Sequence, residues 1–275
     1  MKKLPTYEVF ALRYATQSER LRRTNFIVTD LHDAPMPMDY FVWLIRGNDK
    51  AWLVDTGFNA ATAIVRQRAI LRCPIRSLAL LGVEPAQISD VIMTHLHYDH
   101  AGNLDLLPQA RIHIQEREIH YATGRYMRYA ALRSTYTVDD VVQVVRSVYE
   151  SRVNFCLGDD EVADGIQVIQ AGGHTAGLQA VRVHTQRGWV MLASDASHYY
   201  ENILRESPFP IVFNVGETLE SYTKLLRLCE TPDHLIPGHD PLVLQRYPRW
   251  GDPAHEIVAL HESPTEVLDL PFKLL

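Results

Sequence analysis

Four side chains that commonly bind metal ions occur within six consecutive residues, at His95, His97, Asp99 and His100. The apolar segment Asp90–Met93 leads directly into this run and has the composition of a buried strand. Because alternate residues of a strand face opposite sides of a sheet, a strand cannot direct all four side chains to one point, whereas a turn at its end can. Imidazole nitrogens and carboxylate oxygens are good zinc ligands. The run therefore predicts a metal-binding loop with enough ligands for two ions.

Three later positions have the same character, because each follows a predicted strand: His174 in Gly172–Gly177, Asp195 after Trp189–Ala193, and His239 in Pro237–Asp240. Glycine lets the backbone turn sharply and approach an ion closely, which favours the two histidines as ligands. In layered α/β folds, ligand sites are usually assembled where strands end. We therefore expect these three side chains to join the first four.

Alternating apolar segments predict a chain rich in both strands and helices. The expected strands are Tyr7–Tyr14, Phe41–Ile45, Ala51–Val54, Asp90–Met93, Arg111–Ile114, Val153–Leu157, Gly165–Gln170, Leu178–His184, Trp189–Ala193 and His234–Ile236. The expected helices are Ala60–Leu71, Thr218–Cys229 and most of Glu116–Tyr149. Gly47-Asn48-Asp49 predicts a hairpin turn. The pattern indicates the α/β class and one domain over residues 1–275, with a helical insertion at about 116–150.

The helical insertion is a candidate lid over the site. Its tyrosines and arginines, among them Arg125, Arg128 and Arg133, suit a wall for a planar or carboxylate-bearing substrate. Charged residues on a helix are more often simply solvated, and we favour that interpretation. Pro35–Tyr40, with two methionines, is a second candidate wall, although core packing explains it equally well.

The overall charge and the cysteines narrow the class of protein further. The formal net charge is -6, which argues against non-specific nucleic-acid binding because that requires a basic face. No apolar run is long enough to span a membrane, and we expect neither a membrane segment nor a signal peptide. Cys73, Cys156 and Cys229 are odd in number and far apart, which favours free thiols in a reducing compartment. We therefore expect a cytoplasmic protein.

Taken together, these features make the sequence similar to those of the metallo-β-lactamase superfamily. The His-x-His-x-Asp-His signature is intact, the later His, Asp and His follow in order, and Val54-Asp55-Thr56-Gly57 matches the Asp-x-Gly turn of the family. The resemblance extends from about Phe41 to His239, and the full ordered set is far more specific than a single His-x-His. It implies the αβ/βα four-layer sandwich, in which two mixed sheets face each other between helices and metals lie at one edge.

The resemblance also implies which side chains act as ligands: His95, His97 and His174 for a first ion, Asp99, His100 and His239 for a second, and Asp195 between the two. Asp55 is expected to hold one of these ligands in its orientation without binding an ion itself. The implied cofactor is a pair of divalent metal ions. Zn²⁺ is favoured, although nitrogen and oxygen donors also accept iron, manganese or cobalt.

Within the superfamily, the best match is the N-acyl homoserine lactonase-like branch, whose members include quorum-quenching enzymes. Common zinc β-lactamases carry Cys where this chain has Asp195, and flavo-diiron proteins replace His97 by Glu. The lactonase branch typically has Tyr three residues after the bridging Asp, where this chain has His198 followed by Tyr199. Either of these two residues is a candidate contact for the substrate carbonyl.

The resemblance thus implies a hydrolase that opens a lactone or ester of a small molecule by attack of a hydroxide bridging two metal ions. Asp99 is expected to pass a proton to the leaving alkoxide, and His198 or Tyr199 to assist the carbonyl oxygen. Hydrolysis of a thioester, phosphodiester or cyclic amide at the same site is an alternative, and a catalytically silent metal-binding or sensing protein is another. The resemblance leaves a homodimer open.

Overall fold

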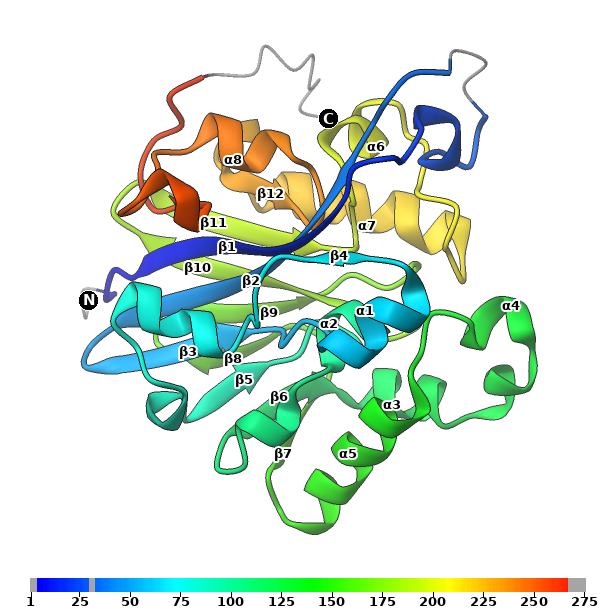
Figure 1. Cartoon of the computed structure of the whole chain (residues 1–275), viewed down its shortest axis with the longest axis horizontal. Coiled ribbons are helices and arrows are strands. Elements are labelled where there is room, and N and C mark those ends of the chain that lie inside the picture. The colour runs from blue at the N-terminus through cyan, green and yellow to red at the C-terminus, as the bar shows by residue number, and fades with distance from the viewer. Residues whose placement is uncertain (1–3, 30–32, 267–275) are drawn as a thin grey trace.

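Two β-sheets lie face to face at the centre of the molecule (Figure 1). The structure, a computed structural model, describes residues 4–29 and 33–266. The eight-stranded sheet contains, in spatial order, β13 (Ile257–Ala259), β1 (Glu8–Gln17), β2 (Met38–Gly47), β3 (Lys50–Val54), β5 (Asp90–Ile92), β6 (Arg111–Gln115) and β7 (Val153–Cys156), and β4 (Ala69–Ile70) pairs with β1. The five-stranded sheet contains β12 (Leu235–Pro237), β11 (Gly188–Ser194), β10 (Gln179–Thr185), β9 (Ile166–Gln170) and β8 (Asp160–Ala163).

Both sheets are mixed, as the resemblance implied. In the larger sheet, β13, β1, β2 and β3 pair antiparallel, whereas β3, β5, β6 and β7 run parallel. In the smaller sheet only the β11–β12 pair is parallel. Parallel neighbours end at the same edge, so the loops after β5, β11 and β12 can meet there.

Strand β2 shows why the layers form. Tyr40, Val42 and Leu44 pack into the core beneath the helices of the larger sheet, whereas Phe41 and Trp43 pack into the core between the sheets. Strand β11 repeats this division, because alternate residues enter the core between the sheets and the core beneath α7. Because strand residues alternate in direction, doubly buried strands require cover on both faces. The result is the expected αβ/βα four-layer sandwich.

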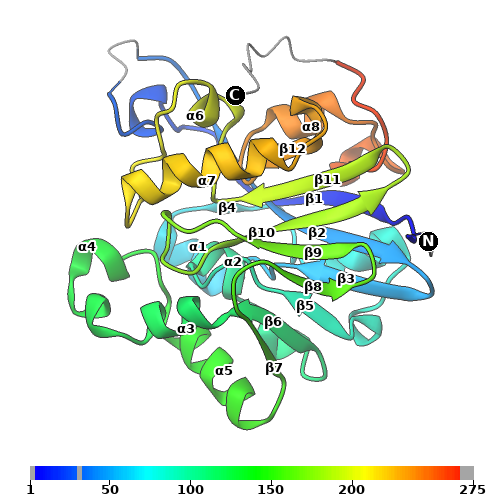
Figure 2. The ribbon, with the colours of Figure 1, turned by 180° about the vertical axis from the view of Figure 1, so that it is seen from behind.

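Helices cover both outer faces. They are α1 (Ala60–Arg66), α2 (Tyr98–Ala101), α3 (Glu116–Ala122), α4 (Ala130–Arg133), α5 (Val138–Tyr149), α6 (Tyr200–Leu204), α7 (Val215–Arg227) and α8 (Leu242–Arg246). Seen from behind, α7 lies along the smaller sheet, and α3 to α5 form a lobe beside both sheets (Figure 2). Among the described residues, no helix is long and apolar enough to cross a membrane.

Most of the predicted strands and helices hold to within a few residues, but one predicted helix is too long, and several short elements, among them β4, β8, β13, α6 and α8, were not predicted. The predicted helix Ala60–Leu71 is too long, because Gln67 takes a left-handed conformation with φ 54° and Ala69–Ile70 pairs with β1. Strand β8 was not predicted, because its acidic sequence has little strand character. The hairpin at Asn48 and Asp49 is confirmed, and both residues have the positive φ of a type I′ turn.

The insertion at 116–150 is helical, as expected, and is broken near Gly124. It contains α3, a 3-10 turn over Arg125–Arg128, α4 and α5. Its assignment as a lid of a single domain stays a prediction. The three cysteines are unpaired, in line with the expectation of free thiols.

Candidate metal centre

All seven predicted ligands converge at the edge where strands of both sheets end. The ligand atoms of one group lie within 4.8 Å of one another, and this group contains His95, His97, His174 and Asp195. A second group meets the same criterion and contains Asp99, His100 and His239. Six side chains are thus divided between two sets of three, and Asp195 is the member that joins them.

The Asp195 carboxylate lies between the two groups, with one oxygen toward each. Its Oδ2 is 3.2 Å from His174 Nε2 and 3.8 Å from His95 Nε2. Its Oδ1 is 3.2 Å from His100 Nε2 and 2.9 Å from His239 Nε2. This is the arrangement expected of a carboxylate that bridges two cations.

Four of the imidazoles are oriented by their other ring nitrogen. In each ring Nδ1 faces a hydrogen-bond partner, so that Nε2 points into the cluster. The partners are the Thr94 hydroxyl for His95 (3.1 Å), the Asp55 carboxylate for His100 (2.7 Å), the Ile211 carbonyl for His174 (2.7 Å) and the Asp39 carbonyl for His239 (2.8 Å).

The donor set fits a pair of divalent cations. The Nε2 atoms of His95 and His100 are buried and have no hydrogen-bond partner among the described residues, and such an atom costs about 1–3 kcal/mol unless something satisfies it. Burial, together with the neighbouring imidazoles, holds the pKa of His95 and His97 well below its usual value. These two rings are therefore neutral, which is the form that binds a metal ion. Nitrogen and carboxylate donors in this proportion suit zinc.

Asp55 holds the first ligand loop, residues 95–100, in place by hydrogen bonds. It follows β3 in a left-handed conformation with φ 61° and is fully buried. Its Oδ1 accepts the Thr94 N–H at 2.7 Å, and its Oδ2 accepts the Thr94 hydroxyl at 2.8 Å and faces His100 Nδ1 at 2.7 Å. The Thr94 hydroxyl also lies 2.9 Å from the hydroxyl of Ser194, the residue before Asp195. One buried carboxylate therefore fixes His100 and the strand end that leads to His95.

Glycines permit the close approach of two later loops. Gly173 has φ 124°, and a Cβ there would lie 2.2 Å from Thr218 Oγ1. A Cβ at Gly238 would lie 2.8 Å from the backbone of Ser194. The glycines that the sequence singled out are thus required where the loops carrying His174 and His239 meet their neighbours.

Glu118 is a buried residue of the site that the sequence did not reveal. Its Oε1 accepts the Leu96 N–H at 3.1 Å and the Tyr136 hydroxyl at 3.2 Å. Its Oε2 accepts the Thr175 hydroxyl at 2.6 Å and the Gly177 N–H at 3.1 Å. This carboxylate ties the loop of His95 and His97 to the loop of His174. Glu118 lies in the first turn of the charged helix α3, and nothing in that local sequence pattern predicts its burial.

A cavity of about 220 Å³ opens onto the ligand cluster. His198 lies in it, with its ring stacked on Phe209 at 3.8 Å between centroids and its Nε2 3.1 Å from Asp195 Oδ2. Burial lowers the pKa of His198 to about 3, so the ring is neutral. Apolar side chains complete the wall, including Met38 and Ile211. His198 therefore lies in the cavity beside the ligand cluster, and its contact with a substrate carbonyl stays a prediction.

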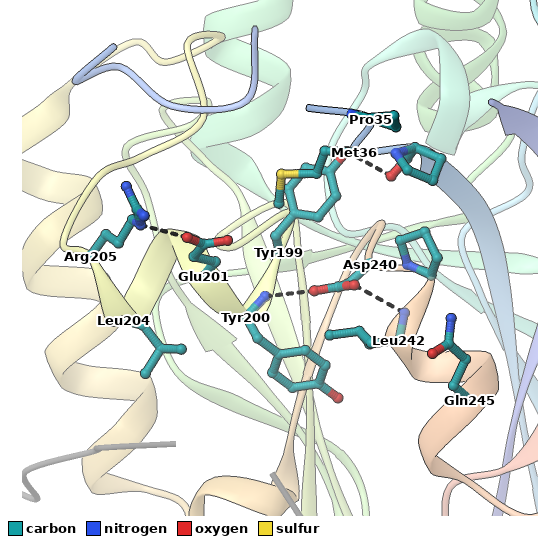
Figure 3. Close-up of a pocket in the computed structure, with 12 residues that line it drawn as sticks. Pro35, Met36, Tyr199, Tyr200, Glu201, Leu204, Arg205, Asp240, Leu242 and Gln245 are labelled. Carbon is teal, nitrogen blue, oxygen red and sulfur yellow. Dashed lines mark hydrogen bonds and ion pairs between the residues drawn. The ribbon is translucent and has the colours of Figure 1, made fainter. Parts of the chain in front are cut away.

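Tyr199, the other candidate contact, points elsewhere. Its hydroxyl donates to the Pro37 carbonyl at 3.2 Å. Its side chain lines a separate pocket of about 550 Å³, together with Met36 and Asp240 (Figure 3). The Asp240 carboxylate there accepts backbone N–H groups of Tyr200 and Leu242 at 3.1 and 3.0 Å, which holds the turn after His239. The position of Tyr199 does not support a role in substrate contact.

The insertion reaches the site through residues 134–136. Ser134 and Thr135 line the cavity, and the Tyr136 ring packs edge-on against His97 with 4.7 Å between centroids. Arg125, Arg128 and Arg133 are exposed and are not among the cavity-lining residues. This agrees with the interpretation favoured from the sequence, that these arginines are solvated.

Comparison with known families identifies the class of the protein. The sequence model of the metallo-beta-lactamase superfamily matches residues 36–245, and the chain belongs to this superfamily. The chain is 32% identical to an N-acyl homoserine lactonase of Bacillus thuringiensis over 172 residues, which are 60% of this chain and 61% of the lactonase. The match thus spans about six tenths of this curated relative. These findings confirm the superfamily recognised from the signature and support its lactonase-like branch.

Solved structures show the same fold. A quorum-quenching N-acyl homoserine lactone hydrolase superposes with a TM-score of 0.71 at 23% identity, over 88% of this chain and 96% of that one. A dizinc quorum-quenching lactonase in complex with a product superposes with a TM-score of 0.69 at 18% identity, over 87% of this chain and 89% of that one. At these identities the likeness establishes the architecture.

Proposed function

We propose that this chain is a dinuclear metal-dependent hydrolase that opens the ring of a small lactone. The observation that carries the proposal is the Asp195 carboxylate, which directs one oxygen to each of two histidine-rich groups. His95, His97 and His174 would hold one ion, and Asp99, His100 and His239 the other. Zn²⁺ is the favoured metal, in keeping with the dizinc lactonase that shares the fold.

Two bound divalent ions would polarise the substrate carbonyl and lower the pKa of a water toward neutrality. The remaining chemistry belongs to the side chains. The neutral His198 ring, held by its stacking on Phe209, has a single N–H, at the Nε2 that faces Asp195 Oδ2, and would donate it to the carbonyl oxygen once the Asp195 carboxylate is bound to the ions. Asp99 lines the cavity and carries the proton lost by the attacking water to the alkoxide that leaves when the acyl C–O bond breaks. Met38, Phe209 and Ile211 exclude bulk water.

The size of the cavity favours a compact substrate. Its volume of about 220 Å³ is below the roughly 300–1,000 Å³ typical of pockets for drug-sized ligands. A lactone ring with a short substituent fits this volume better than a long acyl chain. A quorum-quenching role requires an N-acyl homoserine lactone, so that substrate belongs in the first screen. The unpaired cysteines support a reducing, cytoplasmic location.

The test is a pH-stat screen of the zinc-loaded protein against γ-butyrolactone, N-acyl homoserine lactones, an aromatic lactone, a thioester, a phosphodiester and a cyclic amide. We expect a lactone to be the fastest substrate. Asp99→Asn should reduce its turnover by about 10²–10³-fold, and His174→Ala should abolish it. His120→Ala, at an exposed histidine on α3, is the matched control and should retain activity.

Three outcomes would contradict the proposal. Equal activity in a metal-depleted preparation would exclude a metal-dependent reaction. A thioester or phosphodiester preferred over every lactone would assign the same site to another bond. Full metal content with no turnover of any compound would favour a silent metal-binding protein.

A further inference from the structure

Three arginines line the cavity of the candidate metal centre, and none of them has a carboxylate partner among the residues that the structure describes. Arg20 precedes β2 in the chain, and Arg66 and Arg68 follow β3, yet all three side chains contribute to the cavity wall. Within residues 4–29 and 33–266, no carboxylate forms an ion pair with any of them. Elsewhere in the chain, buried or half-buried arginines such as Arg13 and Arg246 do pair with carboxylates.

Uncharged groups hold these guanidiniums in place. Arg68 donates its Nε–H to the Tyr98 hydroxyl at 3.2 Å and a second N–H to the Arg66 carbonyl at 2.8 Å. Arg66 donates to the Tyr136 carbonyl at 3.0 Å, and its guanidinium lies 4.3 Å from the centre of the Tyr98 ring. These contacts orient the arginines, and no carboxylate of the described chain compensates their charge, which is how a preorganised anion site is built.

Arg20 joins the group from the segment between β1 and β2. It donates to the Thr24 carbonyl at 2.8 Å, and its guanidinium lies 4.8 Å from the centre of Phe209, the ring on which His198 stacks. Burial lowers the pKa of Arg20, and the nearby positive Arg68 adds to the lowering. Like charges held close together in a cavity are stabilised by an anion placed between them.

The carboxylates of the same cavity do not supply that anion. The acidic residues in its wall are Asp99 and Asp195, and both belong to the proposed metal ligands. Asp140 feels the charge of Arg66 at a distance but makes no ion pair with it in the described chain. A neutral lactone would leave all three guanidiniums without a counter-charge.

We therefore propose that the substrate is a lactone carrying a carboxylate, with the ring at the metal centre and the carboxylate on Arg20 and Arg68. This inference rests on the proposed lactone hydrolysis at the same cavity. The planar guanidinium matches a carboxylate through two parallel hydrogen bonds, and the small cavity places the ring and the carboxylate close together. Hydrolysis then gives a hydroxy dicarboxylate as product.

The experiment compares two isosteric substrates of the zinc-loaded enzyme, 5-oxotetrahydrofuran-2-carboxylate and its carboxamide. We expect kcat/KM to favour the carboxylate by about 10–100-fold, the range for charged hydrogen bonds, and the preference to shrink at high salt. Arg68→Gln and Arg20→Gln should each lower this ratio about 10-fold, and Arg68→Lys should fall between. Arg146→Gln, at an exposed arginine on α5, is the matched control and should keep the ratio.

A binding measurement separates this inference from the proposed reaction. Calorimetry with the lactam analogues 5-oxopyrrolidine-2-carboxylate and its carboxamide, after a check that neither is hydrolysed, reports the preference even if no lactone is turned over. Tighter binding of the carboxylate to wild type, lost in Arg68→Gln variants that melt like wild type, supports the anion site. Equal binding of the two lactams, or a carboxylate preference that survives in both glutamine variants, overturns it.

Discussion

The two ligand-bearing regions of this molecule are built in different ways. The first ligand loop, residues 95–100, supplies four side chains from six consecutive positions after β5. The second region supplies one side chain from each of three loops, at His174, Asp195 and His239. In the first loop the buried Asp55 carboxylate orients His100 and the strand end before His95, whereas backbone carbonyls orient His174 and His239 in the second region, where glycines permit close contacts. Glu118 joins the two regions. The ligands of the compact motif thus share one buried side chain, Asp55, as their main support, whereas each dispersed ligand is held by the backbone of a different loop.

The largest effect on metal binding is expected when the Asp55 carboxylate, which supports the first ligand loop, is removed. In Asp55→Asn one acceptor oxygen becomes an amide donor, which cannot satisfy Thr94 and His100 together. We expect metal affinity to fall by about 10–100-fold, as measured by competition with a chelator. Asp105→Asn, at an exposed aspartate, is the control. Unchanged affinity in Asp55→Asn would show that the loop does not depend on this carboxylate.

A smaller effect is expected where the two regions join. The two carboxylate oxygens of Glu118 together accept four hydrogen bonds, and Glu118→Gln replaces one of these oxygens by an amide donor. At least one buried N–H therefore loses its acceptor. We expect the free energy of unfolding to fall by about 1–3 kcal/mol in urea titrations of the metal-free protein. Glu116→Gln on the same helix is the matched control, and equal stability of the two variants would mean that Glu118 does not hold the loops together.

The smallest effect is expected at Asp90, the first residue of β5, at the end of the strand opposite the ligand loop. His113 Nε2 lies 2.7 Å from Asp90 Oδ1, and this hydrogen bond lowers the pKa of Asp90. A depressed pKa stabilises the fold above the unfolded value, near 3.9, and this stability is lost as the pH falls through the folded value. Asp90→Asn should therefore cost less than about 1 kcal/mol at pH 7 and progressively less below pH 4, with metal affinity unchanged.

Melting curves of wild type and Asp90→Asn at pH 7 and in acid check this sign. A gap between the two melting temperatures that widens toward low pH would contradict it. A loss of metal affinity in Asp90→Asn would show that the Asp90–His113 hydrogen bond, like Asp55, supports the metal ligands.

The same contrast explains what the sequence could and could not predict. The first ligand loop could be predicted because its residues are adjacent, and His174 and His239 could be predicted because glycines next to them indicate tight loops. Glu118 and the arginines at 20, 66 and 68 are not, because their roles arise only when distant segments pack together. Helix α1 was overestimated because pairing of Ala69–Ile70 with β1 overrides helical spacing. Neighbouring Tyr199 and His198 were indistinguishable until the fold turned one of them away.

The central claim is tested most directly by counting metal ions per chain. Elemental analysis of the zinc-reconstituted, dialysed protein should give two ions for wild type, one for His97→Ala, in the first group, and one for His239→Ala, in the second. Asp195→Asn should weaken both sites, because its carboxylate faces both groups. A wild-type value of one or fewer, or two ions retained in both histidine variants, would contradict the paired site on which this account depends.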